Sequence, residues 1–281
     1  MKIARTGADI AALAQLACLL EASAPKPGNV SPGRSFADLA YEDFLVSAVA
    51  IAPAFTRVAE QPVGDTIRLA VERTACWTST NTNLGIVLLL APLAKAAATG
   101  GVPLRAAVRH VLDDTTVDDA RQVYAAIRQA KPGGLGRSDV QDVANEPDVT
   151  LLEAMRLAAG RDGVAREYAT AFEVTFEQGA PALARARGDG LSWSDAVVET
   201  YLTLLAGSLD THIIRRTGVA AAERVSTLAR GALDAGGVRS AEGRQAIAAM
   251  DEAIRDDRNS CNPGTTADLT AAAIFVTLVQ S

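Results

Sequence analysis

The sequence contains few of the residues that metal, redox and disulfide chemistry most often uses. Its 281 residues include two histidines and three cysteines, and the cysteines are scattered with no Cys-x-x-Cys spacing. A histidine-rich zinc site is therefore excluded, and the unpaired cysteines favour a reducing, cytoplasmic setting. Aromatic residues make up 4% of the chain and alanine is abundant, so small side chains must fill most of the interior, which lets helices pack closely.

Several motifs and compositional signals are also missing. There is no Gly-x-x-x-x-Gly-Lys phosphate loop, no Gly-x-Gly-x-x-Gly motif and no serine nucleophile elbow. The net charge of −6 argues against a nucleic-acid partner, because such sites need a basic excess. No N-terminal signal-peptide pattern is present, and the longest apolar run, residues 86–93, is too short to span a bilayer. We therefore expect neither a nucleic-acid partner nor a membrane.

The pattern that is present is helical. Apolar residues recur with a period close to 3.6 and strict alternation is nearly absent, which predicts an all-α fold of roughly 10–13 helices. No low-complexity linker divides the chain, and we interpret the polar segment 133–147 as an active-site loop inside one domain that spans residues 1–281. Helices are expected at residues 8–24, 41–58, 64–76, 83–98, 104–112, 117–130, 150–159, 164–178, 194–216, 220–233, 241–258 and 266–279.

Four Pro-Gly pairs interrupt this pattern, at residues 27–28, 32–33, 132–133 and 263–264. Proline cannot continue a helix and glycine accepts positive φ, so each pair predicts a turn. Ligand-binding groups concentrate on loops that a rigid scaffold holds. We therefore predict that these turns bring polar residues around one polar ligand.

Charged and polar residues cluster beside these turns in two places. Lys26, Asn29 and Arg34 surround the first two turns, whose stiff backbone reduces the entropy that a lysine loses on binding an anion. Lys131 and Arg137 flank three glycines, which allow a ligand to approach the backbone closely. The alternatives are an ordinary solvated connection for the first cluster and a flexible surface loop for the second.

Two expected helix starts are rich in short polar residues. Asn81 and Asn83 precede a strongly apolar helix, whose free amide groups and positive dipole end suit an anion. Simple capping by Thr82 or Asn83 is the alternative. Near the C-terminus, Thr265 and Asp268 have the spacing of a capping box. Capping there does not exclude function, because the preceding Asn-Pro-Gly turn still faces outward.

An acidic cluster lies around another expected helix start, at Asp113, Asp114 and Asp118. Carboxylates on one helix face could share a Mg²⁺ ion. Aspartates are also favoured at helix starts and on solvated faces, so both interpretations stay open. His212 follows Asp210 inside a long expected helix, which favours a hydrogen-bonded structural histidine over a catalytic one.

Three motifs taken together resemble the triphosphoribosyl-dephospho-CoA synthase family: KPGNV at residues 26–30, NTNLG at 81–85 and NPGTTADL at 262–269. Their order and spacing cover nearly the whole chain. The resemblance implies an all-α fold and a reaction in which the triphosphoribosyl group of ATP passes to a ribose hydroxyl group of dephospho-CoA while adenine leaves. The chain departs from the family pattern at residues 83–84, where Asn-Leu replaces His-Lys, so it resembles a divergent branch.

The resemblance also implies roles for particular residues. Glycosyl transfer from ATP needs carboxylates near the developing positive charge, a base for the acceptor hydroxyl group and cations for the triphosphate. The expected catalytic carboxylates are Asp38, Asp268 and Glu21, and the expected Mg²⁺ ligands are Asp113, Asp114 and Asp118. The residues expected to bind ATP and a dephospho-CoA-like acceptor are Lys26, Gly28, Asn29, Arg34, Asn81, Asn83, Lys131, Arg137, Asn262, Gly264 and Thr265.

Two other classes of protein remain open. Paired aspartates also suit a different Mg²⁺-dependent all-α enzyme, such as a prenyl-type synthase that handles diphosphates, although such enzymes favour cavity aromatics that are sparse here. A non-catalytic helical binding protein would need no nucleotide affinity. The enzyme interpretation requires that five polar stretches converge on one cavity. The apolar, alanine-rich helices could also form the interface of a homodimer.

Overall fold

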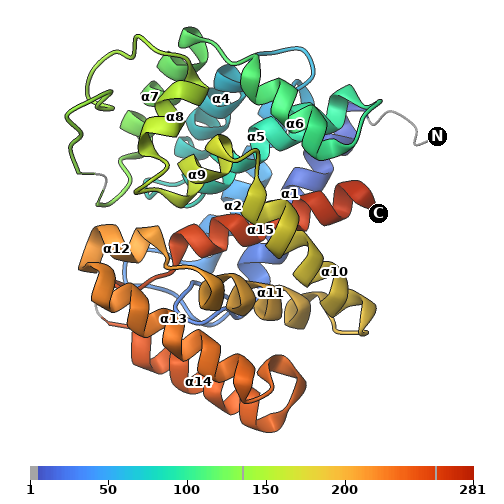
Figure 1. Cartoon of the computed structure of the whole chain (residues 1–281), viewed down its shortest axis with the longest axis vertical. Coiled ribbons are helices and arrows are strands. Elements are labelled where there is room, and N and C mark those ends of the chain that lie inside the picture. Colours follow the sequence, from blue (N-terminus) through green and yellow to red (C-terminus); the bar gives the residue numbers. More distant parts are fainter. Residues whose placement is uncertain (1–5, 135, 257) are drawn as a thin grey trace.

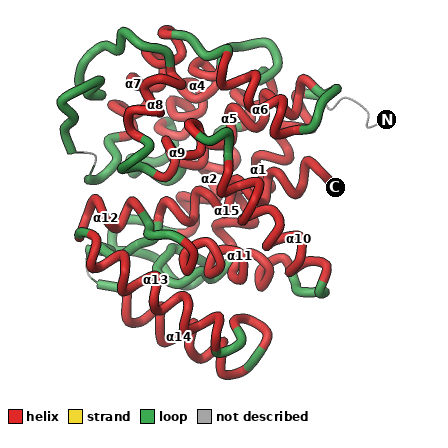
Figure 2. Tube along the Cα trace, in the orientation of Figure 1, coloured by secondary structure: helices red, strands yellow, loops and turns green. Residues whose placement is uncertain are grey.

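The computed structural model describes residues 6–134, 136–256 and 258–281, and most of them are helical (Figure 1). Within these residues there is no β-strand (Figure 2), and an isolated bridge joins Ser31 to Arg34. The predicted all-α fold is therefore confirmed. The helices are α1 (Gly7–Ser23), α2 (Tyr41–Ala50), α3 (Ala52–Thr56), α4 (Val63–Ala75), α5 (Leu84–Thr99), α6 (Leu104–Asp113), α7 (Val117–Ala130), α8 (Leu151–Ala158), α9 (Gly163–Ala169), the π-helical turn η1 (Thr175–Gly179), α10 (Ala180–Gly188), α11 (Trp193–Gly207), α12 (Thr211–Thr217), α13 (Val219–Asp234), the 3₁₀ turn η2 (Gly237–Arg239), α14 (Ala241–Ile254) and α15 (Gly264–Gln280).

Helices α1 and α15 lie between two groups of helices (Figure 1). Helices α4 to α9 form one group and α10 to α14 form the other, and α15 contacts α1, α5, α10 and α11. Residues 269–276 of α15 are all buried, because side chains that are apolar or small on every face suit a helix enclosed by others. The start of α15, which carries the last sequence motif, is thereby fixed relative to both groups.

Helix α5 runs through a proline that a neighbouring helix compensates. Pro92 has no N–H group, so the carbonyl group of Leu88, four residues earlier, lacks its helical donor. The hydroxyl group of the buried Tyr168, on α9, donates to that carbonyl oxygen at 2.6 Å. Two buried polar groups are satisfied at once, and α9 is held against α5.

The expected helix at residues 194–216 is two helices, α11 and α12. They are separated because the carboxylate of Asp210 accepts hydrogen bonds from the backbone N–H groups of His212 and Ile213, at 2.8 and 3.1 Å. Asp210 is therefore the N-cap of a new helix. The break moves His212 from the middle of an expected helix to the first turn of α12.

Two more expected helices are divided. Residues 41–58 form α2 and α3, and Pro53 lies in the first turn of α3. Residues 164–178 form α9 and η1, separated by Ala171 and Phe172, whose φ angles are 50° and 59°. Helix α10 was not predicted. Apolar periodicity does not report such breaks, because it is continuous across them.

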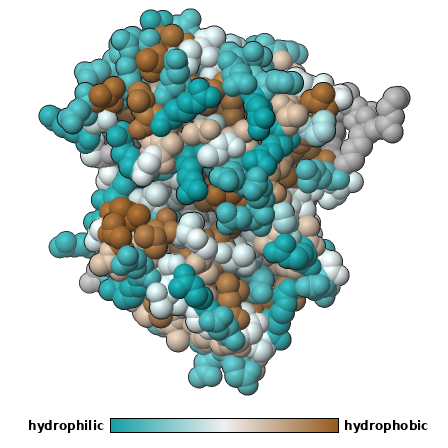
Figure 3. All heavy atoms as spheres, in the orientation of Figure 1, coloured by the Kyte–Doolittle hydropathy of each residue, from teal (hydrophilic) through white to brown (hydrophobic). Residues whose placement is uncertain are grey.

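The surface in Figure 3 is covered mainly by hydrophilic side chains, with hydrophobic side chains exposed near α12. Among the described residues, no single helix has the length and apolar character needed to cross a membrane. Helices α5 and α6 pass that test only when taken together, and they meet at a bend of 114°.

Candidate active site

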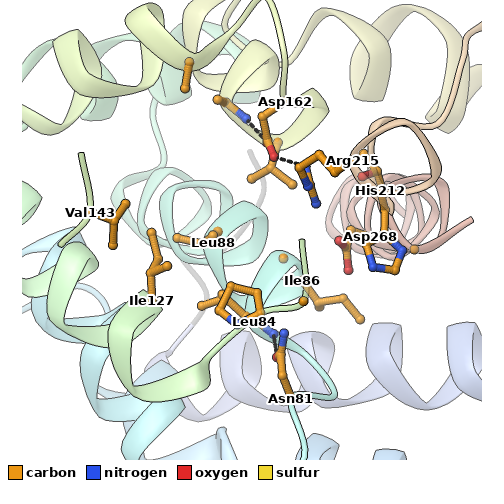
Figure 4. Close-up of a pocket in the computed structure, with 18 of the residues that line it drawn as sticks. Asn81, Leu84, Ile86, Leu88, Ile127, Val143, Asp162, His212, Arg215 and Asp268 are labelled. Atoms are coloured by element: carbon orange, nitrogen blue, oxygen red, sulfur yellow. Dashed lines mark hydrogen bonds and ion pairs between the residues drawn. The ribbon is translucent and has the colours of Figure 1, made fainter. Parts of the chain in front are cut away.

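Four of the five polar stretches that the sequence singled out lie around one cavity of about 370 Å³ (Figure 4). Its lining includes Asn29 after α1, Asn81 and Asn83 before α5, Arg137 in the loop after α7, and Asn262 before α15. Helices α7, α8, α9 and α12 supply further walls. Residues far apart in the sequence thus line one cavity, although the enzyme interpretation required all five stretches and the acidic stretch around Asp113 lies outside it.

Asn29 and Asn262 join the first and last motifs. The Nδ2 group of Asn29 donates to Oδ1 of Asn262 at 2.6 Å, across 233 residues of sequence. Asn29 is 6% exposed, and its Oδ1 atom has no hydrogen-bond partner among the described residues. A buried acceptor without a donor costs stability, so this oxygen is suited to accept a hydrogen bond from a ligand.

Asp268 lies directly against Gly85, in the first turn of α5. A Cβ atom on residue 85 would be 2.0 Å from Oδ2 of Asp268, so this position must be glycine for the carboxyl group to fit. Asp268 lies in the second turn of α15, and both residues line the cavity. The close approach explains why the second and third motifs carry a glycine and an aspartate at these positions.

The surroundings of Asp268 favour its protonated form. Burial raises the pKa of Asp268 well above its ordinary value, and the charges of Glu21, Asp210 and Asp162 raise it further. Arg215 has a smaller effect in the opposite direction. A carboxyl group kept protonated near neutral pH can donate a hydrogen bond or a proton.

His212 lies on the same wall of the cavity as Asp268 (Figure 4). Its Nδ1 atom is 2.9 Å from the carbonyl oxygen of Asn262. A carbonyl oxygen can only accept, so Nδ1 carries the proton and Nε2 keeps a lone pair in the neutral ring. Burial lowers the pKa of His212, against opposing effects of the Asn262 hydrogen bond and the Asp210 carboxylate. The ring is therefore neutral near pH 7.

Sequence reasoning missed His212 because it placed the residue inside a continuous helix. The Asp-x-His spacing was the available signal, since aspartate is a preferred N-cap residue. Asp210 caps two helices at once: Thr266 donates to its Oδ2 atom through both the backbone N–H and the hydroxyl group, each at 2.7 Å. Asp210 is buried, and it fixes the start of α12 relative to the start of α15.

The start of α5 offers free hydrogen-bond donors to the cavity. Oδ1 of Asn81 accepts from the backbone N–H of Leu84 at 3.1 Å, so Asn81 performs the capping that the sequence suggested for residue 82 or 83. The side chain of Asn83 instead donates to the Thr74 hydroxyl group at 3.2 Å. The next two amide groups, of residues 85 and 86, bond to no described residue. Such amide groups, together with the helix dipole, favour an anion.

Three arginines line the cavity: Arg137, Arg161 and Arg215. Arg215 forms an ion pair with Asp162, the N-cap of α9, and its buried Nε has no partner among the described residues (Figure 4). Arg137 and Arg161 form no ion pair with a described residue. The cavity therefore has cationic groups that can neutralise a polyanion.

The opposite wall of the cavity is apolar. Leu84, Ile86 and Leu88 of α5, Ile127 of α7 and Val143 of the loop after α7 line it (Figure 4). Apolar walls with a few converging polar groups are typical of small-molecule sites. The arrangement suits a ligand with a planar or aliphatic part and a polar, charged part.

Lys26 does not lie in the cavity, contrary to the prediction from sequence. It is 1% exposed, and its Nζ atom forms an ion pair with Glu21 Oε1 at 2.9 Å. The same ammonium group donates to the carbonyl oxygens of Glu21 and Ala24. All three donors of the lysine are used inside the protein, so none is left for a phosphate. Glu21 itself lines the cavity, and its catalytic role stays a prediction.

Arg34 and Gly28 are also held by the protein. The Arg34 guanidinium group contacts the carboxylates of Asp251 and Glu252 on α14, at 2.6 and 2.5 Å. The backbone N–H of Gly28 donates to Asp251 at 2.6 Å. Arg34 was predicted to bind phosphate and Gly28 to bind ATP or the acceptor, but the contacts of both residues connect the turns after α1 to α14.

Some of the remaining predicted residues line the cavity and others lie outside it. Gly264 and Thr265 line the cavity, whereas Asp38 and Lys131 do not line it and are exposed. The structure also corrects the expected Mg²⁺ site at Asp113, Asp114 and Asp118. Helix α6 ends at residue 113 and α7 begins at residue 117, so these side chains share no helix face, and all three are exposed outside the cavity.

A family model described as ATP:dephospho-CoA triphosphoribosyl transferase matches residues 7–281. A Pseudomonas fluorescens (strain Pf0-1) protein named "Probable 2-(5''-triphosphoribosyl)-3'-dephosphocoenzyme-A synthase" is 28% identical over 279 residues, which cover 91% of this chain and 86% of the relative. A Stutzerimonas stutzeri (strain A1501) protein of the same name is 28% identical over 194 residues, which cover 69% of this chain and 57% of the relative.

A solved structure shows the same fold. The crystal structure of a candidate triphosphoribosyl-dephospho-CoA synthase from Archaeoglobus fulgidus matches with a TM-score of 0.67 and 30% sequence identity. The match covers 84% of this chain and 99% of that chain. The likeness therefore covers most of the chain.

Proposed function

The chain belongs to the ATP:dephospho-CoA triphosphoribosyl transferase family, and we propose that its cavity transfers the triphosphoribosyl group of ATP to a ribose hydroxyl group of a dephospho-CoA-type acceptor. Adenine is the leaving group, and the product is a precursor of a coenzyme or prosthetic group. The observation that supports this most strongly is the convergence of three distant motifs on one cavity, where Asn29 contacts Asn262 and Asp268 contacts Gly85.

The cationic groups of the cavity are suited to the triphosphate. Arg137 and Arg161 form no ion pair with a described residue, although their charges help to lower the pKa of Asp142, so their guanidinium groups are available for phosphate oxygens. The free amide groups at the start of α5 add neutral donors. The apolar wall, with Leu88 and Ile127, is suited to the adenine ring or to the aliphatic arm of the acceptor.

The carboxylate-bearing wall is suited to the reacting carbon. Glu21 and Asp268 line the cavity from α1 and α15, and the Glu21 carboxylate is suited to stabilise the positive charge that develops on the ribose during transfer. Glu21 is buried and paired with Lys26, which holds its side chain in one orientation. Asn29 Oδ1 is placed to accept a hydrogen bond from a ribose hydroxyl group.

We also propose that Mg²⁺ enters with the triphosphate. Among the described residues, no group of three or more His, Cys, Asp or Glu side chains could hold a metal ion. A nucleotide-bound Mg²⁺ needs no such group, because one or two carboxylates and the substrate phosphates often hold it. Asp142 lines the cavity, and hydrogen bonds from the amides of Ser138 and Ala144 lower its pKa, which keeps it ionised.

The family match supports a single catalytic domain, because one family model matches residues 7–281. We propose that this domain acts in the cytoplasm, where ATP and dephospho-CoA are available. A homodimer stays a prediction. Membership of this family favours the transferase over the two alternatives that the sequence left open, a prenyl-type synthase and a non-catalytic binding protein.

The test is adenine release from ATP, with Mg²⁺ and dephospho-CoA, followed by mass spectrometry of the acceptor product. The double variant Arg137→Ala, Arg161→Ala should raise the KM for ATP by about 100-fold or more, since each lost charge-assisted hydrogen bond is worth about 1.5–3 kcal/mol. Arg109→Ala on the exposed face of α6 is the control and should leave KM unchanged. If no acceptor gains a triphosphoribosyl group, the proposed function is wrong.

A further inference from the structure

The titratable side chains of His212 and Asp268 both lie at the start of α15. A Cβ atom on Gly264 would be 2.8 Å from Nδ1 of His212, so the imidazole ring packs against the first turn of α15. Asp268 is four residues further along that helix, and residues four apart share a helix face. Both side chains line the cavity (Figure 4).

We propose that His212 is the general base for the acceptor hydroxyl group and that Asp268 is the general acid for the departing adenine. The inference rests on the proposed function and assigns the proton transfers within it. The sequence left His212 as a structural residue and gave Asp268 as a catalytic carboxylate without naming a proton that it transfers.

The hydrogen bonding of His212 suits a base at Nε2. Nδ1 is occupied by the carbonyl oxygen of Asn262 at 2.9 Å, which fixes both the tautomer and the ring orientation. No described residue is hydrogen-bonded to Nε2, so its lone pair is available to a substrate. The ring starts neutral because burial lowers its pKa, and an imidazolium ion could not accept a proton.

The packing of Asp268 suits an acid. Its carboxyl group is enclosed between α15 and the start of α5, where Gly85 leaves room for it. Burial and nearby carboxylates favour the form that carries a proton. Opposite pKa shifts in two neighbouring groups are the pattern that separates an acid from a base in one site.

The charged groups around His212 and Asp268 shift the two pKa values in the directions that their signs require. On the His212 side, Asp210 raises the pKa of the imidazole while Arg215 and Arg216 lower it. On the Asp268 side, the carboxylates come from three other elements: Glu21 from α1, Asp162 before α9 and Asp210 before α12. Arg215 opposes them.

The acceptor oxygen forms a bond to the anomeric carbon of ATP, and its proton passes to Nε2 of His212. The bond from that carbon to the adenine nitrogen breaks, its electron pair stays with adenine, and Asp268 supplies a proton to the leaving base. After the products leave, the imidazolium ion releases one proton to solvent and the Asp268 carboxylate takes one up.

The test compares His212→Asn with His110→Asn. An asparagine at 212 keeps an amide donor near the position of Nδ1, for the Asn262 carbonyl oxygen, but has no group at Nε2. We expect kcat for adenine release to fall by about 10²–10⁴-fold, the range for loss of a general base, while the calorimetric Kd for ATP stays within about 3-fold. His110 is exposed on α6 and outside the cavity, so its variant should match the wild type.

The pH profile separates a base from a structural histidine. Wild-type kcat should fall on the acid side, where His212 becomes protonated, and on the alkaline side, where Asp268 loses its proton. The acid limb should disappear in His212→Asn and the alkaline limb in Asp268→Asn. If His212→Asn fails to fold by circular dichroism, His212→Gln takes its place with the same expectations.

Two results would overturn the assignment. One is a His212 variant whose kcat stays within about 3-fold of the wild type, and the other is a slow variant that keeps the acid limb. A wild-type protein that binds ATP but releases no adenine with any acceptor defeats the proposed function and this inference together. Active wild-type and active His212→Asn proteins defeat the inference alone.

Discussion

The carboxyl group of Asp268 occupies the space that a side chain on Gly85 would need, with Oδ2 only 2.0 Å from the position of a Cβ atom. The contact joins the starts of α5 and α15, two helices that are buried along most of their length. Because close-packed protein interiors are hardly compressible, neither helix can move aside to admit even a methyl group.

Gly85→Ala should therefore displace Asp268 and reduce activity with little loss of fold. Alanine is a better helix former than glycine by about 0.5–1 kcal/mol, which offsets part of the strain. We expect kcat to fall by about 100-fold, since a displacement near 1 Å in a site can have that effect. The control is Gly231→Ala on α13, where no atom outside the neighbouring backbone of that helix lies within 4 Å of the new Cβ. It should keep full activity.

Lys26→Met should destabilise the protein without a specific loss of ATP affinity. The substitution leaves the buried carboxylate of Glu21 without its ion-pair partner, and removing one member of a buried pair costs about 3–5 kcal/mol. Urea denaturation measures the change. Lys131→Met, at an exposed lysine, is the control. Wild-type stability combined with lost nucleotide binding would return Lys26 to the phosphate site.

Asp210→Ala should weaken two helix starts at once. It removes the acceptor for the amides of His212, Ile213 and Thr266, and each lost cap costs about 0.5–2 kcal/mol. Ser192→Ala, which removes the single side-chain cap of α11, should cost about half as much. Equal losses of unfolding free energy in the two variants would contradict the double cap.

Asp268→Asn should stabilise the fold at neutral and alkaline pH. The folded state raises the pKa of Asp268, so above pH 4 it binds more protons than the unfolded state, and stability decreases as pH rises toward that raised pKa. Asparagine stays neutral and removes this loss. The Tm of the variant relative to wild type should therefore increase from pH 4 to pH 8, by about 2–4 °C for each kcal/mol. A constant difference across this range would contradict the pKa direction.

Tyr168→Phe should cost about 1–3 kcal/mol, because it leaves the buried carbonyl group of Leu88 without a donor. In a Pro92→Ala background the loss should be smaller, since the backbone N–H of residue 92 can then donate to that carbonyl. A double-mutant cycle by urea denaturation measures the coupling. Additive losses would show that Pro92 and Tyr168 act independently.

The all-α class and most helix positions followed from local patterns. Apolar spacing and capping residues act within one or two turns, so the sequence alone carries them. The same is true of Gly28 and Gly33, whose φ angles of 76° agree with turns read from Pro-Gly pairs. The division between α11 and α12 was missed because apolar spacing continues across it, although Asp210 carried the capping signal.

Only some of the residues that line the cavity could be predicted from the sequence. Asn29, Asn81 and Asn262 were singled out because they lie beside turns or a helix start and in the three motifs of the resemblance, and they do line the cavity. Lys26 and Arg34 were singled out for the same turns, yet they are neutralised by Glu21 and by the acidic residues of α14. A charged side chain can be satisfied by the protein or by a ligand, and sequence does not distinguish the two.

The sequence by itself determined which residues begin and end helices, and which turns carry polar groups. Only the tertiary structure decided which charged side chains form ion pairs within the protein, because pairs such as Arg34 with Asp251 join residues that are 217 positions apart. The same long-range packing placed His212 beside the turn of Gly264 and enclosed Asp268 against Gly85. Electrostatic environment depends on distance in space, so the chemistry of these two groups could not be read along the chain.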